Sequence, residues 1–395
     1  MQHTRKLQNW LSTWINLYTD TGLPRSFAMW TGISVIAGML QDNVVLKEHN
    51  SKLKPNLYVW LLGPPTAGKS ESALPGIDLL RLMPFMEIYD GGLTSTFLFQ
   101  YMESIQQKRA VHNPTLVNPR VYIYSDELAQ TLKHGPLAEQ LMCDLNVMYN
   151  RSTKYGTAAH GLKDIVDPVI NWLACCSPSW LKRCVPKDML DNGFVSRVVT
   201  VYEPLKERRR KGVSADPQVW ADLTHDLLLI SQLKGEFRLT PEAQAARDRW
   251  AEKQFQARLL FDELTQHIYG REEEHALKVA MCLTVSSTDD LVITERAFIN
   301  ATMHVLNARA SSIDVLRSIA MTPLVEIKAY LLQCIRNMAP VAHSALRNKT
   351  WQKIDDNNQF HRLVNSLVAE GQIVLLPSQN GAGAVYDIPR STNQP

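Results

Sequence analysis

Apolar side chains recur at helical spacing along the first forty residues. An apolar stripe needs positions three and four residues apart, which lie on one face of a helix. The chain meets this spacing twice, and Gly22 and Pro24 supply a turn between the two stretches. We therefore predict helices over 7–20 and 25–41, with the stripes Leu7, Trp10, Leu11, Trp14 and Ile15, then Phe27, Trp30, Ile33 and Ile36.

From residue 56 onwards, short apolar runs alternate with helical stretches. Near-continuous apolar strands separated by helices are typical of a parallel sheet that is covered on both faces. The runs predict one α/β domain with a five-stranded parallel sheet. Its strands are expected at 57–62, 87–90, 121–124, 169–176 and 197–202.

The rest of the chain reads as helical segments and one hairpin. A proline and a basic cluster in "PLKERRRKGV" predict a linker, and 218–312 has helical periodicity. Helices near 324–337, 343–350 and 356–369 precede "GQIVLLPSQNGAGAVYDI", a strand, glycine-rich turn and strand, which together predict a winged helix. The expected units are a helical N-terminal unit (1–55), an α/β core (56–204), a basic linker (205–217), a helical lid region (218–318) and a winged-helix domain (319–395).

Composition narrows the class of protein. Apolar residues make up 45% and charged residues 21% of the 395 residues, an ordinary globular balance. The formal charge of +3 provides no general basic field, so any contact with nucleic acid must depend on local charge. No apolar run reaches a membrane-spanning length, and the N-terminus lacks a secretory apolar core. Six scattered cysteines without a CxxC pair indicate reduced thiols in a cytoplasm.

The motif "GPPTAGKS" at 63–70 follows a predicted buried strand and precedes a predicted helix. It fits the phosphate-binding pattern G-x-x-x-x-G-K-[ST] without a mismatch. Gly63 and Gly68 would let backbone amides turn towards phosphate oxygens, and Lys69 would supply a charge to the β and γ phosphates of ATP. Ser70 would offer its hydroxyl to Mg²⁺. The expected ATP contacts are Gly63, Pro64, Pro65, Thr66, Ala67, Gly68, Lys69, Ser70 and Glu71.

A second motif, "VYIYSDE" at 121–127, places two acidic residues after a strand. Ligands bind at the carboxyl ends of parallel strands. Asp126 would hold Mg²⁺ together with Ser70, and Glu127 would polarise the attacking water. The alternative is that this acidic pair only caps the helix beginning at Leu128. The pairing with the first motif favours ATP hydrolysis, with Lys69 and Glu127 as catalytic residues.

Six segments follow one another in an order similar to that of the corresponding segments in a known group of proteins. The chain resembles the P-loop ATPases of phages, plasmids and mobile elements that are similar to superfamily 3 helicases and to the helicase half of primase-helicases. The resemblance covers roughly residues 25–310 and implies an AAA+-like core, a homo-oligomeric ring expected to be a hexamer, ATP with Mg²⁺, and DNA unwinding. The segments are "PNLYVWLLGPPTAGKS", "GGLTSTFLFQYM", "VYIYSDELAQTL", "CDLNVMYNRSTKYG", "DPVINWLACCSPSWL" and "GFVSRV".

Two further residues take roles from this resemblance. Ser177 follows the fourth predicted strand, where this class of ATPase places a polar sensor of the γ-phosphate; a simple strand end is the alternative. Arg197 begins the fifth predicted strand and would reach the nucleotide of a neighbouring subunit as an arginine finger. Arg183 is a rival for that role, and a surface ion pair is the structural alternative for Arg197.

The segment 149–168 would form a hairpin that projects into the ring's pore, as in the helicases it resembles. An ordinary surface hairpin with solvated lysines is the alternative. In such a pore, cationic side chains are expected to contact the phosphates of single-stranded DNA, and an aromatic ring is expected to stack on a base. The candidate phosphate contacts are Arg151, Lys154, His160 and Lys163, with Tyr155 stacking on a base.

The predicted winged helix offers a second contact with DNA. Asn358 and Arg362, on its third helix, can read adenine and guanine edges of a duplex. Arg347, Lys349 and Lys353 can hold the backbone. Asp355 and Asp356 oppose DNA, and winged helices also bind proteins, so both partners stay open.

Together these features predict an ATP-dependent DNA helicase or translocase that replicates a phage or mobile element in the cytoplasm of a bacterial host. Any priming would be done by a separate primase. An ATP-switched replication initiator or helicase loader with little unwinding of its own is the alternative. A defence ATPase built on the same fold is a third possibility, because a fold does not decide a function.

Overall fold

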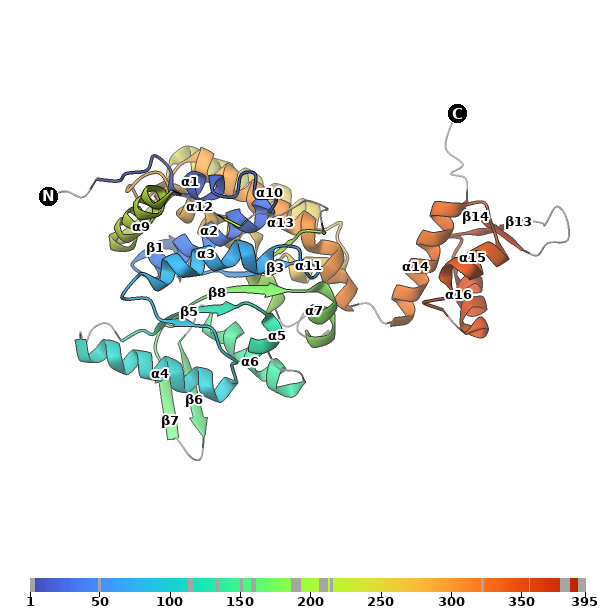
Figure 1. Ribbon diagram of the computed structural model, residues 1–395, viewed down its shortest axis with the longest axis horizontal. Helices are drawn as coiled ribbons and strands as arrows, with labels where there is room; N and C mark the ends of the chain where they lie inside the picture. The colour runs from blue at the N-terminus through green and yellow to red at the C-terminus, as the bar shows by residue number, and fades with distance from the viewer. Residues whose placement is uncertain are drawn as a thin grey trace. The chain divides into compact units, whose positions relative to one another are not determined.

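The computed structural model describes residues 4–48, 51–112, 117–132, 135–149, 152–157, 161–185, 193–205, 212–213, 216–320, 323–354, 356–376 and 384–389. The chain divides into two compact units, Met1–Ile319 and Ala320–Pro395. Figure 1 shows both, and each is described here by itself.

A five-stranded parallel sheet forms the centre of the first unit (Figure 1). Its strands are β3 (Tyr58–Leu62), β4 (Ile88–Tyr89), β5 (Arg120–Ser125), β8 (Val169–Cys176) and β9 (Val198–Tyr202). They lie in the order β4-β5-β8-β3-β9, and every pairing is parallel. The predicted five-stranded parallel sheet is confirmed.

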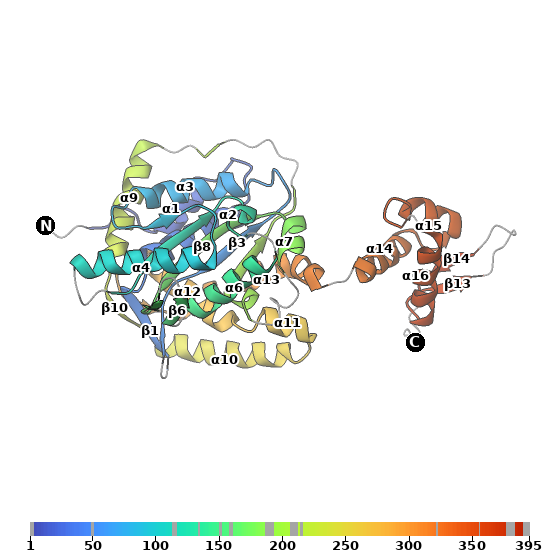
Figure 2. The same ribbon diagram turned by 90° about the horizontal axis from the view of Figure 1, so that it is seen from below.

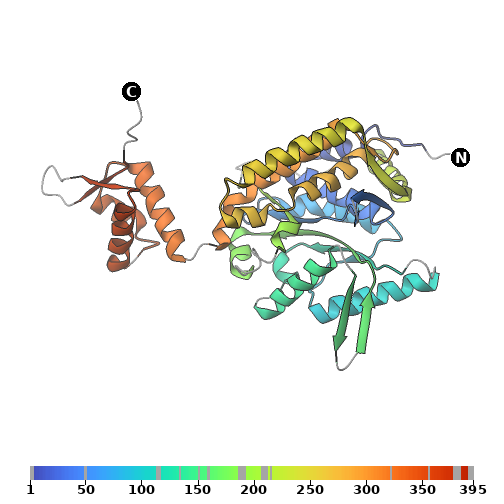
Figure 3. The same cartoon turned by 180° about the vertical axis from the view of Figure 1, so that it is seen from behind.

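Helices cover both faces of this sheet, as Figures 1 and 3 show. Successive strand residues face opposite sides. Val59 and Leu61 of β3 join the apolar core that contains α2. Trp60 faces the other way, with its ring 5.7 Å from that of Trp172. The first face is covered by α2 (Arg25–Leu40) and α3 (Lys69–Arg81), the second by α4 (Ser95–His112), α5 (Leu128–Thr131) and α6 (Pro136–Met148).

The N-terminal helix α1 (Trp10–Asn16) packs within this unit rather than forming a separate one. Trp10 and Trp14 stack with ring centroids 5.7 Å apart. Their indole nitrogens donate to the carbonyls of Leu223 and Ala28, at 2.9 and 2.8 Å. None of the helices in the described ranges is long and apolar enough to cross a membrane. The remaining helices of the unit are α7 (Pro178–Cys184), α9 (Pro217–Gln232), α10 (Pro241–Arg258), α11 (Glu263–Ile268), α12 (Glu272–Val285) and α13 (Glu295–Ala320).

A second sheet corrects the expectation of purely helical segments at 1–55 and 218–318. It has the order β11-β10-β1-β2, with β1 parallel to β10 and antiparallel to β2. Periodicity missed these strands because they are short and β1 finds its main partner about 190 residues further along the chain. The strands are β1 (Val44–Glu48), β2 (Ser51–Leu53), β10 (Gly235–Leu239) and β11 (Val292–Ile293), and Figure 2 shows β1 beside β10.

The predicted hairpin is present as β6 (Thr153–Thr157) and β7 (Gly161–Ile165), an antiparallel pair. Figures 1 and 3 show it extending away from the sheet, beyond α4. Gln106 of α4 ties its base to the body of the unit. Its side-chain amide donates to the Asp164 carbonyl and accepts from the Val166 amide, each at 3.0 Å.

The described part of the second unit contains three helices and three short strands. Its sheet has the antiparallel order β12-β14-β13. The three helices agree with the predicted ranges to within one residue at each end. The elements are α14 (Pro323–Met338), β12 (Val341–Ala342), α15 (His343–Thr350), α16 (Asn357–Ala369), β13 (Val374–Leu376) and β14 (Val385–Asp387). Their core includes Leu331, Ile335, Leu346, Phe360, Leu363 and Tyr386.

Candidate functional site

The loop between β3 and α3 lies at the carboxyl edge of the parallel sheet. A Cβ on Gly63 would lie 2.8 Å from the Ala67 Cβ and 2.9 Å from the Glu203 carbonyl oxygen, so no side chain fits there. Gly68 has φ 83°, in the left-handed region that glycine tolerates, and α3 begins at the next residue. The two glycines thus permit a tight turn into the N-terminus of a thirteen-residue helix, where backbone N–H groups favour an anion.

Lys69 is the first residue of α3, and its ammonium lies over this loop. Its Nζ donates to the carbonyl oxygens of Gly63 and Pro64, at 2.8 and 2.9 Å. Partial burial lowers the pKa of Lys69, while the nearby Glu127 and Asp126 carboxylates act in the opposite direction. The sequence motif therefore places a half-buried cation close to both carboxylates of the second motif.

The other residues of the motif divide between the surface and the core. Pro65 and Thr66 are exposed at the tip of the loop, and Glu71 is exposed on α3. Ser70 is half-buried, and its hydroxyl lies near the Cys175 thiol at the end of β8. Ser70 therefore lies where the loop, α3 and the central strand meet.

Asp126 and Glu127 are exposed directly beyond the carboxyl end of β5. The Tyr124 hydroxyl donates to Asp126 Oδ1 at 2.7 Å, which orients that carboxylate. Glu127 occupies the N-cap position of α5, yet its side chain makes no capping hydrogen bond. Capping of α5 is therefore not the role of the Glu127 carboxylate in this structure.

The central strand β8 separates the two motifs. It pairs with β3 on one side and β5 on the other, so the loop and the acidic pair lie two strand spacings apart, about 10 Å. Ser177 follows β8 and is half-buried between them. Its hydroxyl accepts from the Trp180 amide at 3.3 Å and so caps α7. The predicted sensor thus lies at the expected strand end, with a structural role of its own.

Arg197 lies at the opposite edge of the sheet from the loop. It immediately precedes β9, whose first residue, Val198, pairs with Tyr58 at the amino end of β3. The five residues of β3 span about 16 Å, so Arg197 lies roughly that far from the glycine-lysine loop of its own chain. Arg183, the rival candidate, is exposed on α7 at the carboxyl edge, where its Nε donates to the Ser179 carbonyl at 3.3 Å.

The Arg197 side chain is held within a polar cluster. Its Nη1 donates to the Gly193 carbonyl at 2.6 Å, and its guanidinium lies 5.9 Å from the centre of the Tyr149 ring. Burial and the Arg271 charge lower the pKa of Arg197. The backbone is also fixed, because His275 Nε2 of α12 donates to the Arg197 carbonyl at 3.3 Å.

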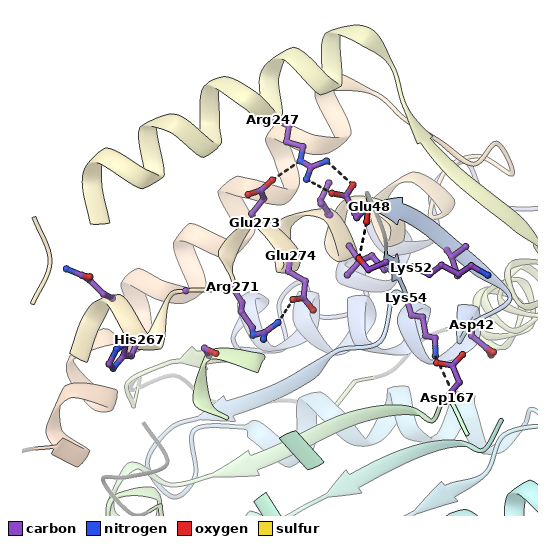
Figure 4. A pocket seen from close by; sticks show the side chains of 17 residues that line it. Asp42, Glu48, Lys52, Lys54, Asp167, Arg247, His267, Arg271, Glu273 and Glu274 are labelled. Atoms are coloured by element: carbon purple, nitrogen blue, oxygen red, sulfur yellow. Dashed lines mark hydrogen bonds and ion pairs between the residues drawn. The ribbon is translucent and has the colours of Figure 1, made fainter. Parts of the chain in front are cut away.

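A cavity of about 1210 Å³ opens beside Arg197, at this amino edge of the sheet (Figure 4). Three of its cations are paired with carboxylates: Arg247 with Glu48 at 2.5 Å, Arg271 with Glu274 at 2.6 Å, and Lys54 with Asp167 at 2.5 Å. The pairs bridge the β1–β2 hairpin, α10, α12 and the entry to β8. Because side chains of both charges line it, this cavity differs in character from the glycine-lysine loop.

The residues predicted to bind DNA lie on two separate elements. Lys154 of β6 is exposed and pairs with Asp164 across the hairpin at 3.7 Å. Tyr155 and Lys163 belong to β6 and β7, but their side chains lie outside what the structure describes, as do residues Arg151 and His160 altogether. In the second unit, Asn358 and Arg362 are both exposed on α16.

Sequence reasoning missed Tyr124 and the cluster behind Arg197. Tyr124 stands two residues before Asp126 on a strand, so strand alternation could have placed both on one face. Nothing local indicates that Tyr149 and His275 meet Arg197. In the described part of the chain, no group of three or more His, Cys, Asp or Glu side chains is arranged to hold a metal ion. The expected Mg²⁺ site at Ser70 and Asp126 therefore stays a prediction.

Comparison with known proteins adds no family. No protein-family model matches this sequence, and no curated protein matches it either.

Proposed function

We propose that this protein is a P-loop ATPase of the AAA+-like class that works as a ring, expected to be a hexamer, and unwinds or translocates DNA during replication of a phage or mobile element. The observation that carries the proposal is the position of β8 between β3 and β5, with the glycine-lysine loop and the acidic pair at neighbouring strand ends. In that order, a phosphate and a water molecule would lie between Lys69 and Glu127.

The residues of the site fit ATP with Mg²⁺. Lys69 lies over the loop at the same edge of the sheet as both carboxylates, and Gly63 has no room for a side chain. Ser70 and Asp126 would hold Mg²⁺, which when bound offsets charge on the phosphate oxygens. Glu127 would accept a proton from the attacking water, and the Ser177 hydroxyl would contact the terminal phosphate.

The position of Arg197 supports a ring. Because Arg197 lies at the sheet edge opposite its own loop, the nucleotide that it would serve is that of another copy. A guanidinium supplied in this way stabilises charge that develops during phosphoryl transfer. The exposed hairpin with Lys154 would then face the pore and its DNA strand.

ATP turnover tests the proposal directly. Lys69→Ala should lower ATP hydrolysis at least a hundredfold, because the charge on the β and γ phosphates is lost. Glu127→Gln should retain ATP binding and stop hydrolysis. Unwinding of a forked DNA by the wild type, and by neither variant, supports the helicase assignment. Wild-type turnover in Lys69→Ala would overturn it.

A second candidate function is favoured by the separate second unit. Its elements follow the order helix, strand, helix, helix, strand, strand, which supports a winged helix. Such a unit suits an initiator or helicase loader that uses ATP as an assembly switch and reads DNA through Asn358 and Arg362. If Glu127→Gln traps rings on DNA while the wild type never separates strands, this second function replaces the first.

A further inference from the structure

Trp351 is an exposed indole in a protein that buries its other tryptophans wholly or in part. The chain has nine tryptophans, and Trp351 alone is classed as exposed, at 57%. It lies directly after α15, at the start of the turn that leads to α16. An indole that presents this much surface to water is available to stack on a partner.

The indole is held in place from one side. The Arg347 guanidinium lies 4.6 Å from the centre of the Trp351 ring and 5.3 Å from that of Phe360. Its Nε donates to Asn357 Oδ1 at 2.7 Å, and its Nη1 donates to the Ile354 carbonyl. Arg347 is thus engaged within the unit with its guanidinium over the indole, while Trp351 remains 57% exposed.

Charge and polarity around Trp351 favour nucleic acid over protein. The segment 343–354 carries three Lys or Arg residues and no carboxylate, and Asp355 and Asp356 follow it directly. Its exposed side chains next to Trp351 are polar or cationic: Lys349, Gln352 and Lys353. Asp356 accepts a hydrogen bond from the Asn358 amide, which partly offsets its charge. An aromatic face beside exposed cations suits a base and its flanking phosphates.

We propose that Trp351 is a stacking platform for an unpaired base of single-stranded DNA, with Lys349 and Lys353 beside the flanking phosphates. The base is unpaired because the faces of bases within a duplex are already covered by their neighbours. The second unit would then bind single-stranded DNA or a fork junction, and not duplex DNA alone. The proposal rests on the nucleic-acid part of the proposed function and is independent of ATP hydrolysis.

Photocrosslinking tests the contact on the full chain without nucleotide. An oligothymidylate carrying one 5-iododeoxyuridine is bound, irradiated and digested, and the crosslinked peptide is identified by mass spectrometry. We expect the crosslink at Trp351, because iodouracil reacts with an aromatic ring stacked on it. Failure of the oligonucleotide to bind, or crosslinks that map only elsewhere, would overturn the platform.

Matched variants give an independent measurement. Trp351→Ala should weaken binding of the oligothymidylate about tenfold relative to Gln352→Ala, its exposed neighbour, while a blunt hairpin duplex binds both alike. Trp351→Phe should fall between them. Equal single-strand affinity of Trp351→Ala and Gln352→Ala would sink the proposal and favour a protein partner. Failure of the ATPase proposal would appear separately, in turnover by Lys69→Ala.

Discussion

At the scale of single residues, Tyr124 shows how a strand can prepare a functional carboxylate. Residues two apart on a strand face the same side, so Tyr124 lies beneath Asp126 and donates to it at 2.7 Å. Burial, the adjacent Cys175 and Asp126 raise the pKa of Tyr124, so the phenol keeps its proton at neutral pH. Because the Tyr124 hydroxyl holds one oxygen of Asp126, the other oxygen is oriented to bind the proposed ligand.

Replacing Tyr124 should therefore affect Mg²⁺ more than ATP itself. Tyr124→Phe keeps the ring and removes the donor, and we expect about tenfold more Mg²⁺ to be needed for full binding of a fluorescent ATP analogue. Tyr122→Phe on the same strand is the control, because that hydroxyl bonds to Ser34 away from the site. Identical Mg²⁺ dependence in the two variants would contradict a positioning role for Tyr124.

At the scale of elements, α12 fixes the segment that presents Arg197. His275 on this helix is buried and donates to the Arg197 carbonyl at 3.3 Å. Burial lowers the pKa of His275 to about 4, against the opposing effect of Glu274. Lys278, one turn further on, is also buried, with its Nζ 4.0 Å from the centre of the Tyr149 ring. The helix thus contacts two neighbouring parts of the Arg197 cluster, the Arg197 backbone carbonyl and the Tyr149 ring.

Acid should loosen this helix. The unfolded chain protonates His275 near pH 6.5 but the folded protein only near pH 4, so the unfolded state binds more protons between these values. The free energy of unfolding should fall as pH drops from 6.5 to 4, by an amount on the order of 3 kcal/mol. Denaturant unfolding across this range measures it.

His275→Gln removes the titrating group and should flatten that slope. His304→Gln is the matched control, because burial lowers the pKa of His304 as well and His304 lies on α13. If the slope is unchanged in His275→Gln and lost in His304→Gln, the acid sensitivity belongs to α13 instead.

At the scale of the whole molecule, the site is divided between the two edges of one sheet. The phosphate loop lies at the carboxyl edge and Arg197 at the amino edge. If Arg197 acts as the proposed arginine finger, its nucleotide must belong to a second copy. The polar cavity lined by Ser196 and Arg271 lies at the same edge as Arg197.

Mixing two inactive variants tests this division. Lys69→Ala and Arg197→Ala should each be inactive alone, since each lacks one half of the site. In an equimolar mixture, about a quarter of interfaces pair an intact loop with an intact arginine, so ATP turnover should recover to about a quarter of the wild-type rate. The control is a second mixture, in which Lys69→Ala is combined with Arg183→Ala instead of Arg197→Ala. No recovery in any mixture would mean that Arg197 acts within its own chain or only structurally.

The core sheet and the candidate loop were predictable because their signals are local. Five apolar runs marked the parallel strands, and the motif at 63–70 stood between a strand and a helix. The strands β1 and β10 were not predictable, since each is short and pairs with a distant segment. The same limit applied to Tyr149 and His275, which reach Arg197 only through packing.

The sequence by itself determined which residues have the chemistry for phosphate, Mg²⁺ and water, because glycine, lysine, serine and carboxylates express that chemistry wherever they lie close together. Only the tertiary structure decided which of them meet. Strand order is a long-range property, and it placed β8 between the two motifs and Arg197 at the far edge. Exposure is likewise a property of packing, so the fold alone distinguished Trp351 from the eight tryptophans that it buries wholly or in part.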